Sequence, residues 1–186
     1  ANFATMVEEH GFTFIGPKPE HITLMGDKIA AKKAVMKAGI PVVPGSDGAV
    51  EGIDEALSVA ADIGYPVLIK ATAGGGGRGM KLANTAEELP NAIKMAQIES
   101  EAAFGNGEVY LEKFLSKPRH IEIQVLADGF GNVVHLGERD CSLQRRHQKI
   151  LEEAPSPALN DDTREKIGKI AADAVRKIGY RSAGTI

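Results

Sequence analysis

A glycine-rich stretch flanked by cations is the first part of the sequence that could do chemistry. Residues 67–69 form a short apolar run typical of a buried strand, Lys70 follows it, and four consecutive glycines precede Arg78. Glycine runs cost conformational entropy, so they persist where the backbone adopts unusual dihedral angles or lies against a ligand. Bare backbone amides can converge on phosphate oxygens, and the two cations would add positive charge. The stretch predicts a phosphate-binding loop, with an unliganded surface loop as the alternative.

The residues around this loop indicate which kind of phosphate loop it is. Residues 74–79 match Gly-x-Gly-x-x-Gly, but a dinucleotide-binding fingerprint opens a helix, whereas residues 80–83 continue as a predicted strand. A Walker A loop would end in Gly-Lys-Ser or Gly-Lys-Thr, and this one ends in Arg-Gly-Met-Lys. The flanks therefore predict a hairpin lid over a nucleotide, of the kind that protein kinases also use.

Polar residues gather a second time over residues 138–155. Acids, bases, amides and a thiol follow one another there with little apolar filling, so these side chains are not explained as a core. Their density fits a site for a polyanion and a small polar substrate, with Gln144 and His147 as hydrogen-bonding groups and Lys149 as a cation. A charged surface loop is the alternative. Cys141 is interpreted as a packed side chain rather than as a reactive thiol, because nearby arginines alone do not indicate reactivity.

The segment just before this run alternates in the manner of a half-buried strand. Residues 121, 123 and 125 are apolar and fall on one face, which places His120, Glu122 and Gln124 together on the other. For Glu122 and Gln124 the alternative is the solvated face of an antiparallel sheet. His120 is the stronger site candidate because the polar run follows.

A lysine at the start of a predicted helix is a further candidate. Asp27 is a plausible N-cap for a helix over residues 27–37, which places Lys28 in the first turn. A cation there opposes the helix dipole, which favours anions at the N-terminus. Lys28 is therefore interpreted either as solvated or as reaching an anionic ligand.

Composition limits the classes of function. The chain has 186 residues, enough for one domain or two small ones, and its formal net charge of −3 gives no overall attraction for nucleic acid or acidic membranes. Cys141 is the one cysteine, which excludes an intrachain disulfide and a cysteine zinc cluster and fits a reducing cytoplasm. No apolar run approaches the roughly 20 residues of a membrane helix, and no secretory signal opens the sequence. We predict a cytoplasmic protein that binds neither nucleic acid nor membrane.

The remaining sequence alternates between predicted helices and strands. Helices are expected over residues 1–10, 19–25, 27–37 with Gly39 as the C-cap, 53–63, from the capping box Thr85-x-x-Glu88 to about Ser100, and 164–178 after an Asp161-Asp162 cap. Strands are expected over residues 12–15, 67–70, 80–83, 109–115, 120–125, 133–136 and 184–186. Met36 and Met95 are placed among the core positions of their helices.

These elements divide the chain into three segments. Residues 43–114 form a small α/β unit that carries the glycine hairpin, and the turn-rich residues 41–48 lead into it. Residues 1–42 precede this unit, and residues 115–186 begin a second sheet. Because both ends fall within predicted elements, we expect a fragment of a longer protein.

Several long motifs resemble biotin carboxylase, an ATP-grasp enzyme. They are Met25-Gly26-Asp27-Lys28, residues 64–71 and 74–80, Pro118-Arg119-His120-Ile121-Glu122-Ile123-Gln124, and residues 138–155. The likeness covers essentially the whole chain and is closest to the subunit of bacterial acetyl-CoA carboxylase, although pyruvate and propionyl-CoA carboxylases share these motifs. It implies an α/β (α+β) ATP-grasp fold, in which residues 1–42 are a remnant of a preceding domain with linker helices, residues 43–114 the lid, and residues 115–186 the first part of the larger subdomain.

The resemblance implies ATP-dependent carboxylation of biotin. Bicarbonate attacks the γ-phosphate of MgATP to give carboxyphosphate, whose carboxyl group passes to the ureido nitrogen of biotin, and Lys149 would hold bicarbonate or carboxyphosphate. Glu112 would accept from the adenine amino group. The nucleotide contacts that the resemblance implies are Lys28 and Lys70 near the phosphates and adenine, Gly76 and Gly77 in the lid, Glu112, Lys113, Phe114 and Leu115 at the adenine hinge, and His120, Gln144 and His147 along the nucleotide.

The resemblance also implies parts that these residues do not contain. The Mg²⁺ carboxylates, the catalytic arginine and the base of the family are expected beyond Ile186, so no metal ligand is assigned here and the chain alone is expected to be inactive. The implied partners are a biotinylated carrier protein, the carboxyltransferase of fatty acid synthesis and a second copy in a homodimer. Alternatives are another ATP-grasp ligase, such as a carbamoyl-phosphate synthetase half, and a nucleotide-binding module without chemistry.

Overall fold

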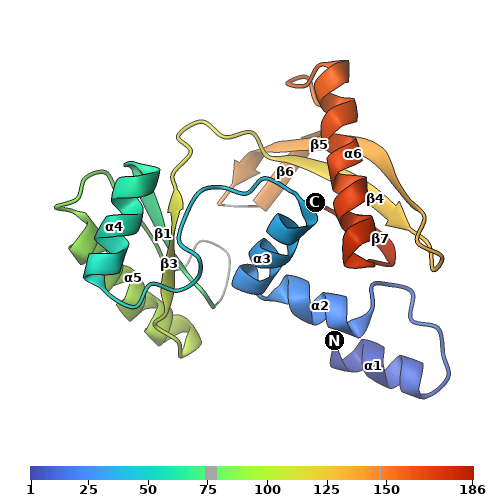
Figure 1. Cartoon of the computed structure of the whole chain (residues 1–186), viewed down its shortest axis with the longest axis horizontal. Coiled ribbons are helices and arrows are strands. Elements are labelled where there is room, and N and C mark those ends of the chain that lie inside the picture. Colours follow the sequence, from blue (N-terminus) through green and yellow to red (C-terminus); the bar gives the residue numbers. More distant parts are fainter. Residues whose placement is uncertain (74–78, 147) are drawn as a thin grey trace. The chain divides into compact units, whose positions relative to one another are not determined.

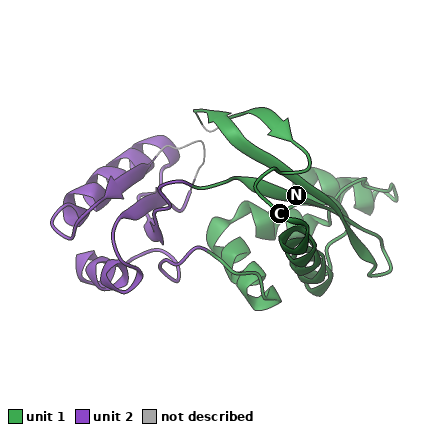
Figure 2. Ribbon diagram, turned by 90° about the horizontal axis from the view of Figure 1, so that it is seen from above, with its two compact units in different colours: residues 1–42, 118–186 green, residues 43–117 purple. Residues whose placement is uncertain are grey.

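The structure is a computed structural model that describes residues 1–73, 79–146 and 148–186 (Figure 1). The chain forms two compact units (Figure 2). Unit 1 combines residues 1–42 with residues 118–186, and unit 2 comprises residues 43–117. Unit 1 is therefore assembled from both ends of the sequence, whereas the assignment of residues 1–42, 43–114 and 115–186 to three parts of an ATP-grasp enzyme stays a prediction.

Unit 2 is built around a three-stranded antiparallel sheet whose central strand precedes the glycine run. β1 (Val67–Ala71) pairs with β2 (Met80–Ala83) on one side and β3 (Val109–Lys113) on the other. The helices α4 (Ile53–Ile63) and α5 (Leu89–Phe104) contribute to its core, in which Ile69, Leu89 and Leu111 are fully buried. Burying each such side chain stabilises the fold by about 1.5–3 kcal/mol, and this packing fixes the path of β1.

Unit 1 is built around a four-stranded antiparallel sheet in the order β6-β5-β4-β7. Its strands are β4 (Ile121–Ala127), β5 (Val133–Arg145), β6 (Gln148–Glu153) and β7 (Ser182–Thr185), and α6 (Asp161–Ile178) packs Ala171 and Val175 against Ile123 and Val125. The helices α1 (Asn2–Glu9), α2 (Pro19–Gly26) and α3 (Lys28–Ala38) complete the unit, with α3 against α6. None of the helices in the described parts of the chain is long and apolar enough to cross a membrane.

Several elements predicted from capping residues and strand patterns are confirmed. The side chain of Asp27 caps α3 and accepts a hydrogen bond from the backbone N–H of Ala30 at 2.8 Å. The helix ends at Gly39, whose φ of 94° lies in the left-handed region that favours glycine. The predicted strands on either side of the glycine loop are β1 and β2, with Lys70 opposite Met80. The expected hairpin is therefore present up to the loop itself.

The helix start predicted at the Thr85 capping box is wrong. α5 begins instead at Leu89, with Pro90 in its first turn. Had the helix started at Thr85, Pro90 would lie in its interior, where it removes a backbone hydrogen bond and clashes with the preceding turn. The side chain of Glu88 accepts from the backbone N–H of Asn84 at 2.8 Å and so stabilises the turn that precedes the helix.

The cap of the last helix also differs from the prediction. Asn160, not Asp161 or Asp162, is the N-cap of α6, and its side chain accepts from the backbone N–H of Thr163 at 2.8 Å. The two aspartates occupy the first turn of the helix. Their negative charges are favourable there because the N-terminal end of a helix carries partial positive charge.

Some apolar residues are more exposed than the sequence predicted. Residues 12–15 form no strand, because no strand of the described chain lies beside them to complete a hydrogen-bonded ladder, and Ile15 is 93% exposed. Met36 and Met95 are exposed rather than core residues. In α5 the buried positions are 89, 92, 93, 96 and 100, a helical stripe that residue 95 does not join.

Most of the polar run over residues 138–155 lies on the two antiparallel strands β5 and β6. β5 continues to Arg145, well beyond the predicted end at residue 136, and β6 returns beside it with every residue exposed. Within β5, Glu138 and Asp140 are buried although both are acidic. A buried carboxylate needs partners, and Ser156 and Arg164 supply some of them from segments outside the strand. The two-residue alternation that reveals most strands is therefore hidden here.

Candidate functional site

A cluster of charged side chains spans β4, β5 and β6 in unit 1. Glu122 on β4 lies opposite Arg139 on β5, and Lys149 on β6 forms an ion pair with the same carboxylate. Arg139 donates from one terminal nitrogen to Oε2 of Glu122 at 3.1 Å and from the other to Oε1 of Gln124 at 2.7 Å. We call His120, Glu122, Arg139, Gln144 and Lys149 the polar cluster.

His120 and Gln144 extend the cluster toward a small surface pocket. Nε2 of His120 lies 2.9 Å from Oε1 of Glu122, and the amide nitrogen of Gln144 lies 3.0 Å from Nδ1 of His120. These contacts fit a neutral imidazole that donates from Nε2 and accepts at Nδ1. Arg119, Ser142 and these two side chains help to line the pocket, whose volume is about 400 Å³. The predicted site residues His120, Gln144 and Lys149 are thus joined, in part through Glu122.

The electrostatics of the cluster are set by Glu122. Burial alone would raise the pKa of this carboxyl, but hydrogen bonds from Lys149, His120 and Arg139 outweigh burial and lower the pKa from 4.5 to about 2. The hydrogen bond to Glu122 in turn raises the pKa of the Lys149 ammonium. At neutral pH one carboxylate therefore bridges two permanent cations. The side chain of Lys149 is 38% exposed, so part of it faces solvent.

Unit 2 contains a second ion pair between predicted site residues. Nζ of Lys70 on β1 donates to Oε2 of Glu112 on β3 at 2.6 Å, and both side chains are mostly buried. The two residues lie on adjacent strands of the sheet, where Glu112 is directly opposite Leu68. Lys70 therefore stands on a strand that is paired on both sides, and Glu112 stands on a strand that pairs with β1 and forms an isolated bridge with Gly45.

The segment after Glu112 is anchored through its backbone and one lysine. Nζ of Lys113 donates to the carbonyls of Gly64 and Tyr65 at 3.0 and 2.8 Å. The backbone N–H of Phe114 donates to the carbonyl of Pro66 at 3.1 Å. These bonds hold the predicted hinge segment against the residues that precede β1. Leu115, the last residue of that segment, is half exposed.

The structure does not assign four other predicted residues to either group. Lys28 is exposed in the first turn of α3 and does not belong to the polar cluster. Gly76, Gly77 and His147 lie outside the described residues. Just after the loop, Gly79 has a φ of 67°, and a Cβ there would lie 2.9 Å from the Cβ of Ala71. Glycine at this position therefore allows the close approach of the two hairpin arms.

Cys141 is a packed side chain. It is fully buried on β5, and burial raises the pKa of its thiol. The thiolate is the reactive form of cysteine, so a raised pKa together with burial disfavours reactivity. The packing interpretation of the sequence is therefore supported.

Sequence reasoning missed part of the polar cluster and identifies no metal site. Glu122 appeared only as one residue of a polar strand face, and Arg139 only as part of a charged run, although the alternation with His120 placed Glu122 on the right face.

Among the residues that the structure describes, no group of three or more His, Cys, Asp or Glu side chains could hold a metal ion.

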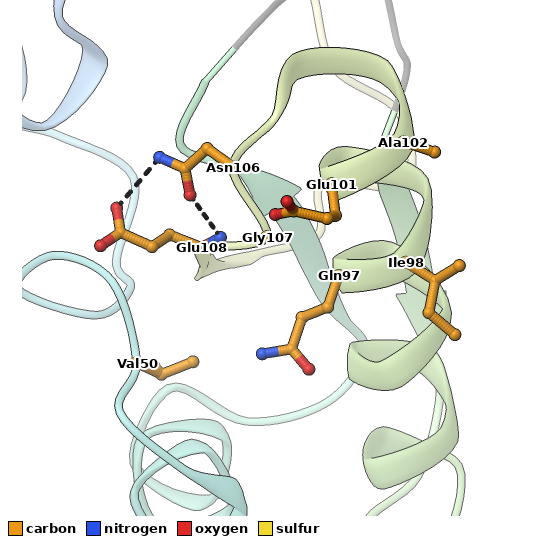
Figure 3. Close-up of a pocket in the computed structure, with 8 residues that line it drawn as sticks. All are labelled: Val50, Gln97, Ile98, Glu101, Ala102, Asn106, Gly107 and Glu108. Carbon is orange, nitrogen blue, oxygen red and sulfur yellow. Dashed lines mark hydrogen bonds between the residues drawn. The ribbon is translucent and has the colours of Figure 1, made fainter.

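A larger surface pocket in unit 2 is lined by none of the residues of these two groups (Figure 3). It measures about 710 Å³ and is lined by Val50, Gln97, Ile98, Glu101, Ala102, Asn106, Gly107 and Glu108. Its charged lining residues are two glutamates, which would repel a phosphate group. The pocket is therefore not a candidate for binding a polyanion.

Comparison with known proteins identifies the family. Residues 27–186 match the family described as "Carbamoyl-phosphate synthase L chain, ATP binding domain". The chain belongs to this family. A biotin carboxylase from Nostoc sp. is 60% identical over all 186 residues, and the chain spans 42% of the length of that relative. The phosphate-binding loop stays a prediction, because residues 74–78 lie outside the described residues.

Solved structures show the same likeness. The biotin carboxylase domain of the Hydrogenobacter thermophilus 2-oxoglutarate carboxylase, a dimer in complex with MgADP, ADP and bicarbonate, matches with a TM-score of 0.90 at 52% identity. A Campylobacter jejuni biotin carboxylase in a βγ-ATP complex also matches with a TM-score of 0.90, at 50% identity. Each match covers 99% of this chain and 41% of the other. The predicted resemblance to biotin carboxylase and the predicted ATP-grasp fold class are confirmed.

Proposed function

We propose that this chain forms the nucleotide- and bicarbonate-binding part of a biotin carboxylase, which uses ATP and bicarbonate to carboxylate biotin on a carrier protein. The observation that carries the proposal is the 60% identity with the Nostoc biotin carboxylase over all 186 residues. The polar cluster supports it, because cations and hydrogen-bond donors are what the anionic substrates of this reaction need.

In this proposal the polar cluster handles the reacting anions. Lys149 would bind bicarbonate or carboxyphosphate through its ammonium, and His120, Gln144 and His147 would line the nucleotide. Bicarbonate oxygen attacks the γ-phosphate and ADP leaves. The ureido nitrogen of biotin then loses its proton to a base and takes the carboxyl group of carboxyphosphate, and inorganic phosphate leaves. Because two anions must meet, the protein contributes chiefly positioning and charge neutralisation. Glu122 would keep Lys149 protonated and hold it at the site.

Unit 2 would grip the nucleotide. Lys70 would contact the phosphates and the surroundings of adenine, and Lys28 of unit 1 would add a second cation. The segment from Glu112 through Lys113 and Phe114 to Leu115 would border adenine, with Glu112 accepting from its amino group and backbone groups pairing with the ring. Gly76 and Gly77 would cover the phosphates from the lid.

Mg²⁺ would neutralise phosphate charge when it accompanies ATP. Lys149 and Lys70 are suitable for anion binding but not for binding a metal, and the described part of the chain offers no cluster of three or more metal-binding side chains. The resemblance to biotin carboxylase is the reason that the proposal assigns the Mg²⁺ carboxylates to other segments, and no step is derived through the metal.

The proposal extends to partners and location. A biotinylated carrier protein would bring biotin, a carboxyltransferase would use the carboxylated product in fatty acid synthesis, and a second copy would form a homodimer, as in the Hydrogenobacter thermophilus structure, which is a dimer. These partners, like the proposed cytoplasmic location, rest on similarity to biotin carboxylases.

An ATP titration of the chain, with and without Mg²⁺, tests the nucleotide part of the proposal. Calorimetry should show saturable binding that Lys70→Ala weakens by about tenfold, because one charge-assisted contact contributes about 1.4 kcal/mol. Lys81→Ala is the matched control, since Lys81 is similarly buried on the neighbouring strand and pairs with Glu99. Equal effects of both substitutions, or no ATP binding, would contradict the assignment of Lys70.

Turnover separates this proposal from its alternatives. The isolated chain should hydrolyse no ATP in the presence of bicarbonate, because catalytic groups are assigned to other segments. A graft of this sequence in place of the matching 186 residues of the Nostoc relative should hydrolyse ATP faster when biotin is added. ATP hydrolysis that needs bicarbonate but ignores biotin would favour a ligase of the carbamoyl-phosphate synthase type, after which the family is described. ATP binding without turnover by the graft would favour a binding module.

A further inference from the structure

Two buried acidic residues on β5 are the starting point. Glu138 and Asp140 are only 4% and 3% exposed, and residues two apart on a strand point to the same face. A buried carboxylate is costly unless it is paired or hydrogen-bonded. Oε1 of Glu138 accepts from Arg164 at 2.7 Å and from the backbone N–H of Ser156 at 3.0 Å, whereas buried Oε2 has no hydrogen-bond partner among the described residues. This acid therefore joins α6 to the segment that follows β6.

Asp140 accepts hydrogen bonds from Ser156 and from Ser142, a residue next to the polar cluster. Its Oδ2 accepts from the hydroxyl of Ser156 at 3.0 Å, and its Oδ1 accepts from the backbone N–H of Ser142 at 3.1 Å and from the Ser142 hydroxyl. The hydrogen bond from Ser142 lowers the pKa of Asp140, which keeps the carboxylate ionised. Asp140 therefore fixes the orientation of the Ser142 hydroxyl.

Ser142 passes this constraint to His120. A hydroxyl can donate one hydrogen bond, and Ser142 donates it to Asp140. The oxygen of Ser142 can therefore accept a hydrogen bond from the backbone N–H of His120 at 3.0 Å. The carbonyl of His120 accepts from the backbone N–H of Cys141 at 2.7 Å. Both backbone groups of His120 are thereby held just before β4 begins at Ile121. One of these two bonds depends on a side chain.

Hydrogen bonds therefore link Asp140 through Ser142 to His120, which lines the small surface pocket of unit 1. Ser142 lines the 400 Å³ pocket together with His120 and Gln144, and the imidazole of His120 bonds to both Gln144 and Glu122. We propose that Asp140 and Ser142 are positioning residues, which fix the backbone of His120 and thereby aim its imidazole for nucleotide binding. The nucleotide-binding part of this inference rests on the proposed function, whereas the aiming of the imidazole does not.

Three variants of the chain test the aiming of His120. Ser142→Ala removes the acceptor, Ser142→Thr restores a hydroxyl, and Ser100→Ala is the control because it removes a buried hydroxyl that donates to the Asn106 carbonyl in unit 2. NMR of the imidazole and of the His120 amide should show altered shifts and faster amide exchange in Ser142→Ala, recovery in Ser142→Thr and no change in Ser100→Ala. Unchanged His120 signals in folded Ser142→Ala would overturn the inference.

Steady-state kinetics of the Nostoc graft test whether the position of His120 affects ATP binding. Ser142→Ala should raise KM for ATP by about 5- to 10-fold with little change in kcat, the scale of one lost hydrogen bond, and Ser142→Thr should recover most of it. Recovery by Ser142→Thr excludes a general loss of folding as the cause. An active graft whose KM for ATP does not respond overturns the inference alone. An inactive unsubstituted graft counts against the proposed function, and the His120 signals of the chain then decide the inference.

Discussion

The two lysines proposed to meet anions are held in place by different means. Lys70 lies on the central strand of unit 2, where the neighbouring Ile69 and Leu111 are fully buried, so packing of β1 sets its position. Lys149 lies on β6, an edge strand with every residue exposed, and its ammonium is held by Glu122 two strands away. A packed core positions one cation, and a network of polar side chains positions the other.

This difference determines what each region tolerates. A site positioned by packing is sensitive to loss of volume and insensitive to changes of nearby charge. A site positioned by a polar network is sensitive to the loss of any shared acceptor, because the remaining charges lose their partner together. Substitutions that remove volume in unit 2 and charge in unit 1 should therefore have their main effects on different measurements.

Leu111→Ala should give the largest change in stability. Leu111 is fully buried on β3, and truncating a buried leucine costs about 2–5 kcal/mol in transfer and cavity free energy. Urea unfolding, combined with hydrogen exchange of the β1 amides, measures this loss and shows whether it lies in unit 2. Leu136→Ala is the control because Leu136 is 65% exposed, and its effect should stay within about 0.5 kcal/mol. Similar costs for both would refute the packing argument.

Glu122→Gln should have the largest effect on chemistry. The substitution keeps the shape of the side chain but removes the charge that Lys149 and Arg139 share. In the Nostoc graft, kcat/KM for bicarbonate should fall by about 100-fold, the scale on which a misplaced electrostatic group affects a transition state. Glu152→Gln is the matched control, since Glu152 is more exposed and lies 3.4 Å from Arg139. The network argument fails if the control loses as much activity.

The same carboxylate should make stability depend on pH. The pKa of Glu122 is about 2 in the folded protein and 4.5 without these contacts, so its contribution is complete above pH 4.5 and is lost as pH falls toward 2. The difference corresponds to about 3 kcal/mol, which exposure of Lys149 and His120 reduces to about 1–2 kcal/mol. Unfolding free energies of the unsubstituted chain and Glu122→Gln should converge as pH falls through this range. A constant gap between the two would contradict the prediction.

The parts of the fold that the sequence predicts correctly are those set by local chemistry. Asp27 and Gly39 bound α3 because capping depends on residues within one turn, and the alternation at residues 121, 123 and 125 reveals β4. The errors come from competing or distant influences. Pro90 moves the start of α5 past Thr85, and β5 carries a buried acid, Glu138, whose partners Arg164 and Ser156 lie in later segments.

The candidate site shows the same limit. His120, Gln144 and Lys149 were predicted from residue type and motif, and the structure joins them. Glu122 and Arg139, which connect them, have no distinctive local pattern, because their importance comes from register across three strands. Asp140 and Ser142 were also not identified from sequence, since a buried acid on a strand looks like any charged residue until its partners are placed.

The smallest effect is expected where packing already does the positioning. Glu112→Gln keeps an oxygen that can accept from Lys70, and β1 and β3 keep their ladder and their buried core. The free energy of unfolding should therefore fall by about 1 kcal/mol at most, because Lys70 keeps a hydrogen-bond acceptor and loses only the charge of its partner. Urea unfolding measures it, and hydrogen exchange at Lys70 shows whether β1 has moved. A loss as large as that of Leu111→Ala would mean that charge, not packing, positions Lys70, and the contrast between the two lysines would disappear.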